Sequence, residues 1–315
     1  MIDTYFSVII PLFNRSKTIS KAIKSVLNQS FTDFELIVVD DCSTDNSSEI
    51  VHQFQLLDSR IRYLKNENNL ERCITRNIGI QSAKGKYICF LDSDDYHLPF
   101  HLETFHKKIL EEKEPKAFLF TSAWNETEDD LRTERVCPEI GNMDLYYYFL
   151  NYTVNPQRWC IERSVADAIL FDPEIVICED LDFSLRVVNA GIQIIQIPIQ
   201  TTVYVAAIDS FTHGDPQKWE KELFYLNRIF AKHKIKEAIS NSDQNRQLSI
   251  RYYHLSVKNS LLKNNKKVIF FAVKSFFLNP NGYKSGITKD LFFLIIYSFP
   301  FIRLIRQLLR RKKTI

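Results

Sequence analysis

The chain has 315 residues, which is enough for one large α/β domain with an appendage or for two modest domains. Its content of 45% apolar and 25% charged residues is typical of a globular protein and excludes an intrinsically disordered one. The net charge of +3 hides an asymmetry, since residues 251–315 hold 14 Lys/Arg and one acid, whereas residues 1–250 hold 27 basic and 37 acidic residues. A basic tail on an acidic body indicates an anionic surface as the partner of the tail.

The first part of the chain, about 120 residues, alternates short apolar runs with stretches of helical periodicity, a pattern typical of βαβ units around a parallel sheet. Near-continuous apolar runs predict strands that are buried on both faces. Helices are expected between these strands, where apolar residues recur every three or four positions. The expected strands lie at residues 6–11, 34–40, 61–66, 87–91 and 118–122.

The sequence pattern changes twice in the rest of the chain. Between about residues 125 and 215 the pattern is irregular, with helices expected near 144–151 and 180–189 and an alternating run at 192–200. From about residue 216 the pattern is helical. The sequence therefore predicts an α/β catalytic domain at 1–215 and a helical C-terminal region at 216–315.

Three features bear on the compartment. The N-terminus has no basic segment before its short apolar run, so no secretory signal is expected. No run reaches the roughly 18 apolar residues of a membrane-spanning helix. The six cysteines are scattered and form no CxxC pair, which indicates reduced thiols. We therefore expect a cytoplasmic protein.

Acidic residues gather at the ends of two expected strands. Asp40 and Asp41 end the second strand, and Asp92, Asp94 and Asp95 follow the fourth. Ligands of an open parallel sheet bind beyond the carboxyl ends of its strands, so the two clusters should line one crevice. Clustered carboxylates suit Mg²⁺ or Mn²⁺, which commonly bridge to phosphates of a substrate. A solvated acidic turn is the alternative for either cluster.

No GxGxxG segment and no P-loop occur in the sequence, and the chain has only seven glycines. The ligand is therefore not expected to bind in a glycine-rich phosphate loop, which argues against dehydrogenases and P-loop ATPases. Four segments, in order and at similar spacing, resemble family 2 glycosyltransferases over about residues 6–212. These segments are SVIIPLFNR, VVDDCSTDNS, TRNIGIQSAKGKYICFLDSDD and ICEDLDFSLRV.

This resemblance implies a GT-A fold, an α/β class with a Rossmann-like, mostly parallel sheet flanked by helices, here with a C-terminal helical extension. It also implies an inverting transfer of a sugar from a nucleotide-diphosphate donor, with a UDP-sugar favoured. The acceptor would be a glycan or a lipid-linked molecule in bacterial surface-polysaccharide biosynthesis.

The resemblance assigns donor-binding roles to five residues. Pro11 and the loop that follows would close over the nucleotide base. Asp41 would bind the base through its carboxylate, and Asp40 would support that loop. Arg76 and Asn77 would lie beneath the pyrophosphate. An ordinary surface charge is the alternative for Arg76, and an ordinary helix residue is the alternative for Asn77.

The aspartates after the fourth strand would form the metal site, again by resemblance. Asp92 and Asp94 make up the DxD element, in which Asp94 would coordinate Mg²⁺ or Mn²⁺. Asp92 would contact the ribose or the metal. Asp95, the third acid, would bind a sugar hydroxyl or make a structural hydrogen bond.

The pair Glu179-Asp180 opens an expected helix and would supply catalysis. An inverting transfer needs a carboxylate that takes the proton of the acceptor hydroxyl. The resemblance assigns this base to Asp180, with Glu179 orienting it or touching the donor sugar. The alternative is a helix cap, because acids in a first turn are favoured by the helix dipole.

Two segments differ from the family pattern or only approach it. Relatives often have Tyr-Arg-x-His-x-x-Ser late in the domain, whereas this chain has Val205 and Ala207 where the Arg and His would fall. His213 could substitute for that histidine, or it is a plain loop residue. The difference admits an inactive nucleotide-binding scaffold as an alternative function. The QRW run at 157–159 is interpreted as a chance match to processive synthases, with Trp159 either stacking on an acceptor or lying in the core.

The C-terminal tail combines apolar and basic residues. The apolar run at 291–302 is too short to span a bilayer as a helix. After it, Arg303, Arg306 and Arg310 lie opposite an apolar helix face, and RRKK follows at 310–313. This pattern is typical of a helix that lies on anionic lipid, with a helix docked on the catalytic domain as the alternative. We expect no nucleic-acid partner and a protein peripheral on the inner face of the membrane.

Overall fold

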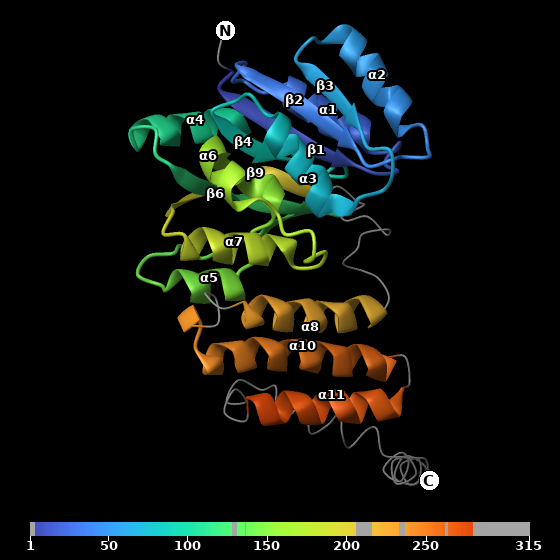
Figure 1. The fold of residues 1–315 in the computed structure, drawn as a ribbon, viewed down its shortest axis with the longest axis vertical. Coiled ribbons are helices and arrows are strands. Elements are labelled where there is room, and N and C mark those ends of the chain that lie inside the picture. The colour runs from blue at the N-terminus through green and yellow to red at the C-terminus, as the bar shows by residue number, and fades with distance from the viewer. Residues whose placement is uncertain are drawn as a thin grey trace, which may run out of the picture. The chain divides into compact units, whose positions relative to one another are not determined.

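The structure is a computed structural model that describes residues 4–127, 131–135, 137–205, 216–232, 237–261 and 264–279 (Figure 1). The chain divides into two compact units, Met1–Ser210 and Phe211–Ile315. The predicted basic tail and His213 lie outside the described residues.

The first unit is built on one nine-stranded sheet of the described residues. Its strand order is β3-β2-β1-β4-β8-β6-β9-β5, and β7 pairs with β6 outside this path. The strands are β1 (Phe6–Leu12), β2 (Phe34–Asp40), β3 (Ile61–Lys65), β4 (Tyr87–Phe90), β5 (Tyr96–His97), β6 (Ala117–Glu126), β7 (Arg132–Arg135), β8 (Trp159–Glu162) and β9 (Gln193–Val205).

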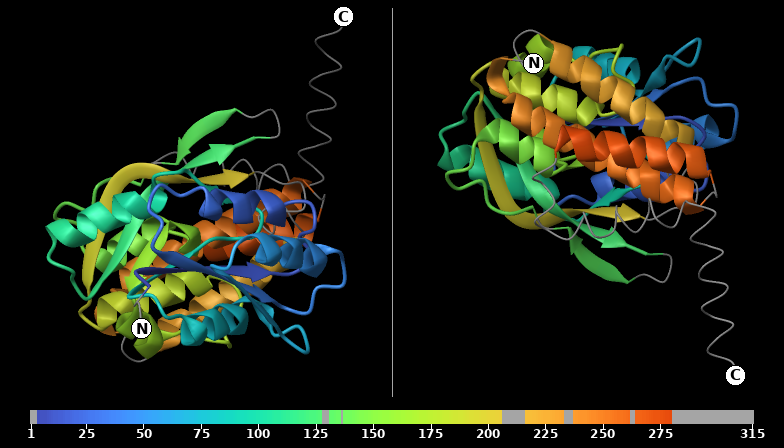
Figure 2. Two further views of the ribbon diagram at one scale, coloured as in Figure 1. Left: turned by 90° about the horizontal axis from the view of Figure 1, so that it is seen from above. Right: turned by 90° about the horizontal axis from the view of Figure 1, so that it is seen from below.

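The sheet has a parallel half and a mixed half. Strands β3, β2, β1 and β4 are all parallel, as the apolar runs of the sequence predict. Beyond them, β8 is antiparallel to both of its neighbours, β4 and β6, while β6 and β9 are parallel. The β6–β7 hairpin (green) projects beside the long, curved β9 (yellow) in Figure 2. The α/β fold class is confirmed, with antiparallel pairs in the half that the irregular part of the sequence forms.

Seven helices and one 3₁₀ turn accompany the described strands of this unit. Their buried positions follow the predicted apolar spacing, as in α1, where Ile19, Ala22, Ile23 and Val26 are buried. The elements are α1 (Ile19–Leu27), α2 (Ser47–Leu57), α3 (Glu71–Ser82), α4 (His101–Glu111), α5 (Leu145–Asn151), η1 (Pro156–Arg158), α6 (Arg163–Ile169) and α7 (Glu179–Asn189).

The core of the first unit is aromatic around β8. Trp159 is fully buried, with its ring 5.3 Å from that of Phe183 and 6.0 Å from that of Phe171, both measured between centroids. The core alternative for Trp159 is therefore correct, and the acceptor-stacking alternative is wrong, because no face of its ring reaches solvent. This packing fixes the segments on either side of β8.

The second unit contains α8 (Pro216–Ala231), α10 (Asn241–Leu261) and α11 (Asn265–Leu278). Leu223, Leu255 and Phe271 form its core, one residue from each helix. The predicted helix pair at 251–263 and 266–278 corresponds to the second half of α10 and to α11. Within the described ranges, no helix is long and apolar enough to cross a membrane.

Candidate active site

The loops after β1 and β2 are tied together at the carboxyl edge of the sheet. Pro11, near the end of β1, lies opposite Val39 of β2 in the parallel register. Three residues later, Asn14 has a positive φ of 51°, and its Oδ1 accepts a hydrogen bond of 2.8 Å from the backbone N–H of Thr44. The left-handed backbone, which asparagine tolerates better than most residues, turns the first loop toward the second.

Asp40 and Asp41 are both buried at the end of β2. Asp40 accepts hydrogen bonds from the backbone N–H of Ser43 (2.8 Å) and the hydroxyl of Tyr63 (2.5 Å), so it holds the turn after the strand. The Oδ1 atom of Asp41 accepts from Asn66 Nδ2 and from the N-cap backbone N–H of α3, both at 2.8 Å. These bonds fix the carboxylate that is predicted to read the nucleotide base.

The turn after β4 places three aspartates in three different environments. The backbone N–H of Asp95 donates to the carbonyl of Asp92, which closes the turn. Asp95 is buried, and its two carboxylate oxygens accept from Gln157 Nε2 (2.7 Å) and from the backbone N–H of Val205 (2.9 Å). Burial, with the nearby charges of Asp92 and Asp94, raises the pKa of Asp95 well above its usual range. Asp95 thus makes structural hydrogen bonds, which is one of the two roles predicted for it.

Asp94 is partly exposed and lies near one cation. Its side chain is 29% exposed, and Oδ2 lies 3.5 Å from Nε of Arg15. Desolvation and the charge of Asp92 raise the pKa of Asp94, a condition that a divalent cation would relieve. No group of three or more His, Cys, Asp or Glu side chains among the described residues is arranged to hold a metal by itself. Mg²⁺ usually keeps water and substrate phosphates among its ligands, so two carboxylates fit such an ion.

A buried arginine links the acidic turn to the predicted catalytic pair. Arg76, on α3, donates through Nη2 to Asp92 Oδ1 (2.9 Å) and through Nη1 to Glu179 Oε1 (3.0 Å). Its side chain is only 4% exposed. Burial acts against the charged guanidinium, but the carboxylates of Asp92 and Glu179 outweigh it and raise the pKa of Arg76. The surface-charge alternative for Arg76 is therefore wrong.

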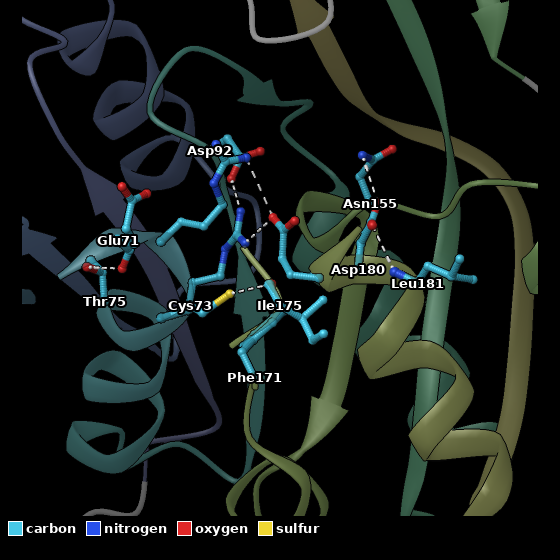
Figure 3. A network of polar contacts seen from close by, with 12 residues as sticks. Glu71, Cys73, Thr75, Asp92, Asn155, Phe171, Ile175, Asp180 and Leu181 are labelled. Atoms are coloured by element: carbon cyan, nitrogen blue, oxygen red, sulfur yellow. Dashed lines mark hydrogen bonds and ion pairs between the residues drawn. The ribbon is translucent and has the colours of Figure 1, made fainter. Parts of the chain in front are cut away.

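Asn77, the neighbour of Arg76, contacts the loop before α7. Its Nδ2 donates to the carbonyl of Phe171 (2.8 Å), and its Oδ1 accepts from the backbone N–H of the same residue (2.7 Å). Cys73 Sγ also contacts this loop, at the carbonyl of Ile175 (3.4 Å), as Figure 3 shows. The structure thus gives the side chain of Asn77 two backbone partners that fix the loop. Its role beneath a pyrophosphate stays a prediction.

The predicted catalytic pair, Glu179-Asp180, lies in the first turn of α7. Cys178 is the N-cap residue with a left-handed φ of 64°, and the helix begins at Glu179. Asp180 accepts hydrogen bonds from the backbone N–H of Leu181 (2.8 Å) and from Asn155 Nδ2 (3.3 Å; Figure 3). Burial and the adjacent carboxylate of Glu179 raise the pKa of Asp180 to about 7. A carboxylate with a pKa near neutrality is suited to accept a proton at neutral pH.

The sequence analysis assigned no role to two buried polar residues of η1, Gln157 and Arg158. Gln157 belongs to the QRW run that was interpreted as a chance match, yet it binds Asp95. Arg158 is fully buried and donates to the carbonyls of Thr121 (2.7 Å) and Thr153 (3.2 Å). The sequence shows only that Gln157 and Arg158 precede a tryptophan. Their hydrogen-bond partners lie far away in the sequence, so no local pattern identifies them.

Comparison with known proteins identifies the first unit. Residues 7–160 match the family model "Glycosyl transferase family 2". Residues 7–160 belong to this family. Glycosyltransferase GlyG of Streptococcus pneumoniae serotype 4 is 33% identical over 164 residues, which cover 52% of this chain and 48% of GlyG. A Campylobacter jejuni protein named GalNAc(5)-diNAcBac-PP-undecaprenol beta-1,3-glucosyltransferase is 40% identical over 129 residues, 41% of each chain.

A solved structure extends the comparison to the fold. S. aureus TarS 1-349, in complex with UDP-GlcNAc, superposes with a TM-score of 0.63 at 20% identity, over 87% of this chain and 81% of that one. The predicted GT-A fold is confirmed by this likeness and by the sheet described above. The chain spans about half the length of the two curated relatives that it matches.

The ion pairs of Arg76 generate a testable expectation. Arg76→Met would leave Asp92 and Glu179 without their shared cation in a buried setting, and breaking a buried pair in this way typically costs about 3–5 kcal/mol. Arg72→Met is the matched control, because Arg72 lies 3.7 Å from the same Glu179 oxygen but is 36% exposed, where such pairs contribute about 1 kcal/mol or less. Urea denaturation of the full chain, followed by circular dichroism, measures the free energy of unfolding of both variants. Equal stability of the two variants would contradict the buried link.

Proposed function

We propose that this chain is an inverting glycosyltransferase that transfers a sugar from a nucleotide-diphosphate donor, preferably a UDP-sugar, to a glycan or lipid-linked acceptor in bacterial surface-polysaccharide biosynthesis. The observation that carries the proposal is Arg76, which joins Asp92 of the acidic turn to Glu179, the neighbour of Asp180. A donor-binding group and a candidate base are thereby held in one site. The family membership and the names of the relatives support it.

Donor binding is assigned to the carboxyl edge of the sheet. Both hydrogen bonds described for the Asp41 carboxylate involve Oδ1. The other oxygen would accept a hydrogen bond from the nucleotide base. Pro11 and the loop tied to it would cover the base. Asp94 and Asp92 would hold Mg²⁺ or Mn²⁺ together with the diphosphate of the donor. When bound, such a metal neutralises the charge that develops on the leaving diphosphate.

Catalysis is assigned to the first turn of α7. The acceptor hydroxyl oxygen attacks the anomeric carbon, a new C–O bond forms, and the bond to the diphosphate breaks with its electron pair leaving on the nucleotide. Asp180 takes the proton of the acceptor hydroxyl. Glu179 keeps Asp180 in place by its bond to Arg76 and, through its charge, keeps Asp180 basic enough for this step.

A second candidate function has one observation in its favour. Val205 and Ala207 stand where relatives have Arg and His, and a chain without those groups could bind a nucleotide without turning it over. This alternative is a catalytically inactive nucleotide-binding scaffold at the membrane. It predicts nucleotide binding, no turnover and no effect of changing Asp180.

Nucleotide binding is the first expectation. UDP with Mn²⁺ should raise the melting temperature of the full chain more than GDP, CDP or dTDP, because a ligand at about 100 times its Kd adds about 2.7 kcal/mol of stability. Asp94→Asn should abolish the metal-dependent part of the shift. Asp167→Asn is the control, since Asp167 is exposed on α6 and is not among the predicted site residues. The absence of a shift with every nucleotide would refute the donor site.

The pH dependence of turnover is the second expectation. Donor turnover needs the ionised form of Asp180, so kcat/KM should rise about tenfold per pH unit below about 7 and level off above it. Asp180→Asn should lower the rate by about 10²–10⁴ while the nucleotide-induced melting shift is retained. Asp167→Asn again serves as control. A wild-type chain that binds the nucleotide but turns over no nucleotide sugar, whether or not Asp180 is replaced, would favour the scaffold.

We also propose that the protein is cytoplasmic and peripheral on the inner face of the membrane, with the second unit and the basic tail facing anionic lipid. Within the described part of that unit, α11 carries three lysines and no acid, and it exposes Phe270 and Phe277. Aromatic and basic residues together on one helix are typical of interfacial binding. The basic run 310–313 adds a contribution of about 1 kcal/mol per charge near such a surface.

Vesicle binding tests this location. Replacing Arg310, Arg311, Lys312 and Lys313 with Gln should weaken co-sedimentation with phosphatidylserine vesicles by at least tenfold, and salt should weaken the wild type in the same way. The Lys107→Gln variant, changed on the exposed surface of α4, should bind as the wild type does. Equal binding to neutral phosphatidylcholine vesicles would show that charge is not the cause.

A further inference from the structure

The carboxylate of Asp180 has a neighbour that no sequence motif indicates. Asn155 precedes η1, and its Nδ2 donates to Asp180 Oδ2 at 3.3 Å, while the other oxygen accepts from the backbone of α7. Figure 3 shows Asn155 beside Asp180, with a dashed line between the two side chains. An N–H donated to a carboxylate stabilises its charged form and fixes its orientation.

The hydroxyl of Tyr204 selects the orientation of this amide. Tyr204 Oη donates to Asn155 Oδ1 at 3.2 Å. Burial raises the pKa of Tyr204, so the hydroxyl keeps its proton and remains a donor. An amide whose oxygen is engaged by a donor turns its NH₂ group the other way, and here that group faces Asp180. With the hydroxyl absent, the amide could rotate and present its oxygen to the carboxylate instead.

The two segments that carry Asn155 and Tyr204 are clamped by one residue of the acidic turn. Asp95 accepts from Gln157, two residues after Asn155, and from the backbone N–H of Val205, the residue after Tyr204. The buried Arg158 adds a bond from η1 to β6. These contacts make Asn155 and Tyr204 rigid relative to the site, which a positioning role requires.

The charged groups near this chain of bonds come from several elements. Glu179, on α7, and Arg76, on α3, act on Asp180 with opposite sign. Arg158, Arg135, Asp95 and Asp92 act on Tyr204. The guanidinium of Arg135, on β7, lies over the ring of Tyr204, 4.6 Å from the ring centroid.

We propose that Tyr204 and Asn155 are positioning residues for Asp180: the Tyr204 hydroxyl orients the Asn155 amide, and this amide holds the Asp180 carboxylate in its ionised, proton-accepting arrangement. The inference rests on the proposed function, in which Asp180 is the base. It adds Asn155, which precedes η1, and Tyr204 of β9 to a group that otherwise depends on α7 and α3.

The test uses the full chain and compares three variants over pH 5.5 to 9. Tyr204→Phe removes only the hydroxyl, and Asn155→Leu removes the amide at similar size. Tyr146→Phe is the matched control, because its hydroxyl also donates to an asparagine side chain, that of Asn189 at the last position of α7, nine residues after Asp180. The readout is release of nucleoside diphosphate from the nucleotide sugar that the wild type turns over, with UDP-sugars tried first.

The expected result is a shift of the acidic limb of kcat/KM toward higher pH by about one unit in Tyr204→Phe, since a hydrogen bond to a charged group typically corresponds to at least that change. At pH 6 the rate should fall about tenfold, while above pH 8.5 it should approach that of the wild type. The melting shift caused by nucleotide should be unchanged. Asn155→Leu should give a shift at least as large.

Two outcomes would overturn the inference in different ways. If Tyr204→Phe gives the profile of the wild type and of Tyr146→Phe, the positioning role is refuted and the proposed function stands. If the wild type binds nucleotides but turns over no nucleotide sugar at any pH, the proposed function fails and this inference fails with it. Should Asn155→Leu not fold, Tyr204→Phe still decides, because it removes a single oxygen.

Discussion

The buried guanidinium of Arg76 is the interaction on which the rest of the candidate site depends. It reaches the acidic turn after β4 through Asp92 and the first turn of α7 through Glu179, two segments that are 87 positions apart in the chain. A charge removed from water is costly unless it is paired and hydrogen-bonded, so the two carboxylates and the arginine require one another. The distance between the acidic turn and the first turn of α7 is thereby fixed by electrostatics, in addition to packing.

Sheet topology brings these groups within reach. The parallel strands β1, β2 and β4 end at one edge, which collects the loop after Pro11, the pair Asp40 and Asp41 and the acidic turn. Strand β8 then runs antiparallel between β4 and β6, so the segment before it, with Asn155 and Gln157, arrives at the same edge. The antiparallel insertion therefore supplies the second wall of the site that the parallel half alone would lack.

Three aspartates of one turn illustrate how environment separates identical side chains. Asp92 is paired with a buried cation, Asp94 is partly open beside Arg15, and Asp95 is buried with both oxygens engaged by Gln157 and the backbone of β9. Desolvation and the charge of Asp92 raise the pKa of Asp94 and of Asp95, but the Asp94 side chain is partly exposed whereas Asp95 is buried. The three aspartates thus differ in their partners: a buried cation for Asp92, an exposed cation for Asp94, and an amide and a backbone N–H for Asp95.

The sequence by itself determined the parallel strands, the α/β class and the acidic clusters at the ends of β2 and β4. These follow from local patterns, because an apolar run of five to seven residues can be buried in only a few ways and acids after it must lie at its end. The resemblance to the family added the pair Glu179-Asp180, whose position in the first turn of α7 agrees with that expectation.

Only the tertiary structure decided which polar residues face one another. Asn77 contacts the backbone of Phe171, Gln157 binds Asp95, and Tyr204 reaches Asn155, and every one of these bonds joins residues at least 49 positions apart. No local pattern records such a partner, because a hydrogen bond depends on where two segments meet after the sheet has formed. The antiparallel placement of β8 was equally hidden, since its four residues are too few to show a period. What a short polar segment does in this protein is therefore set by the strands that carry it to its partner.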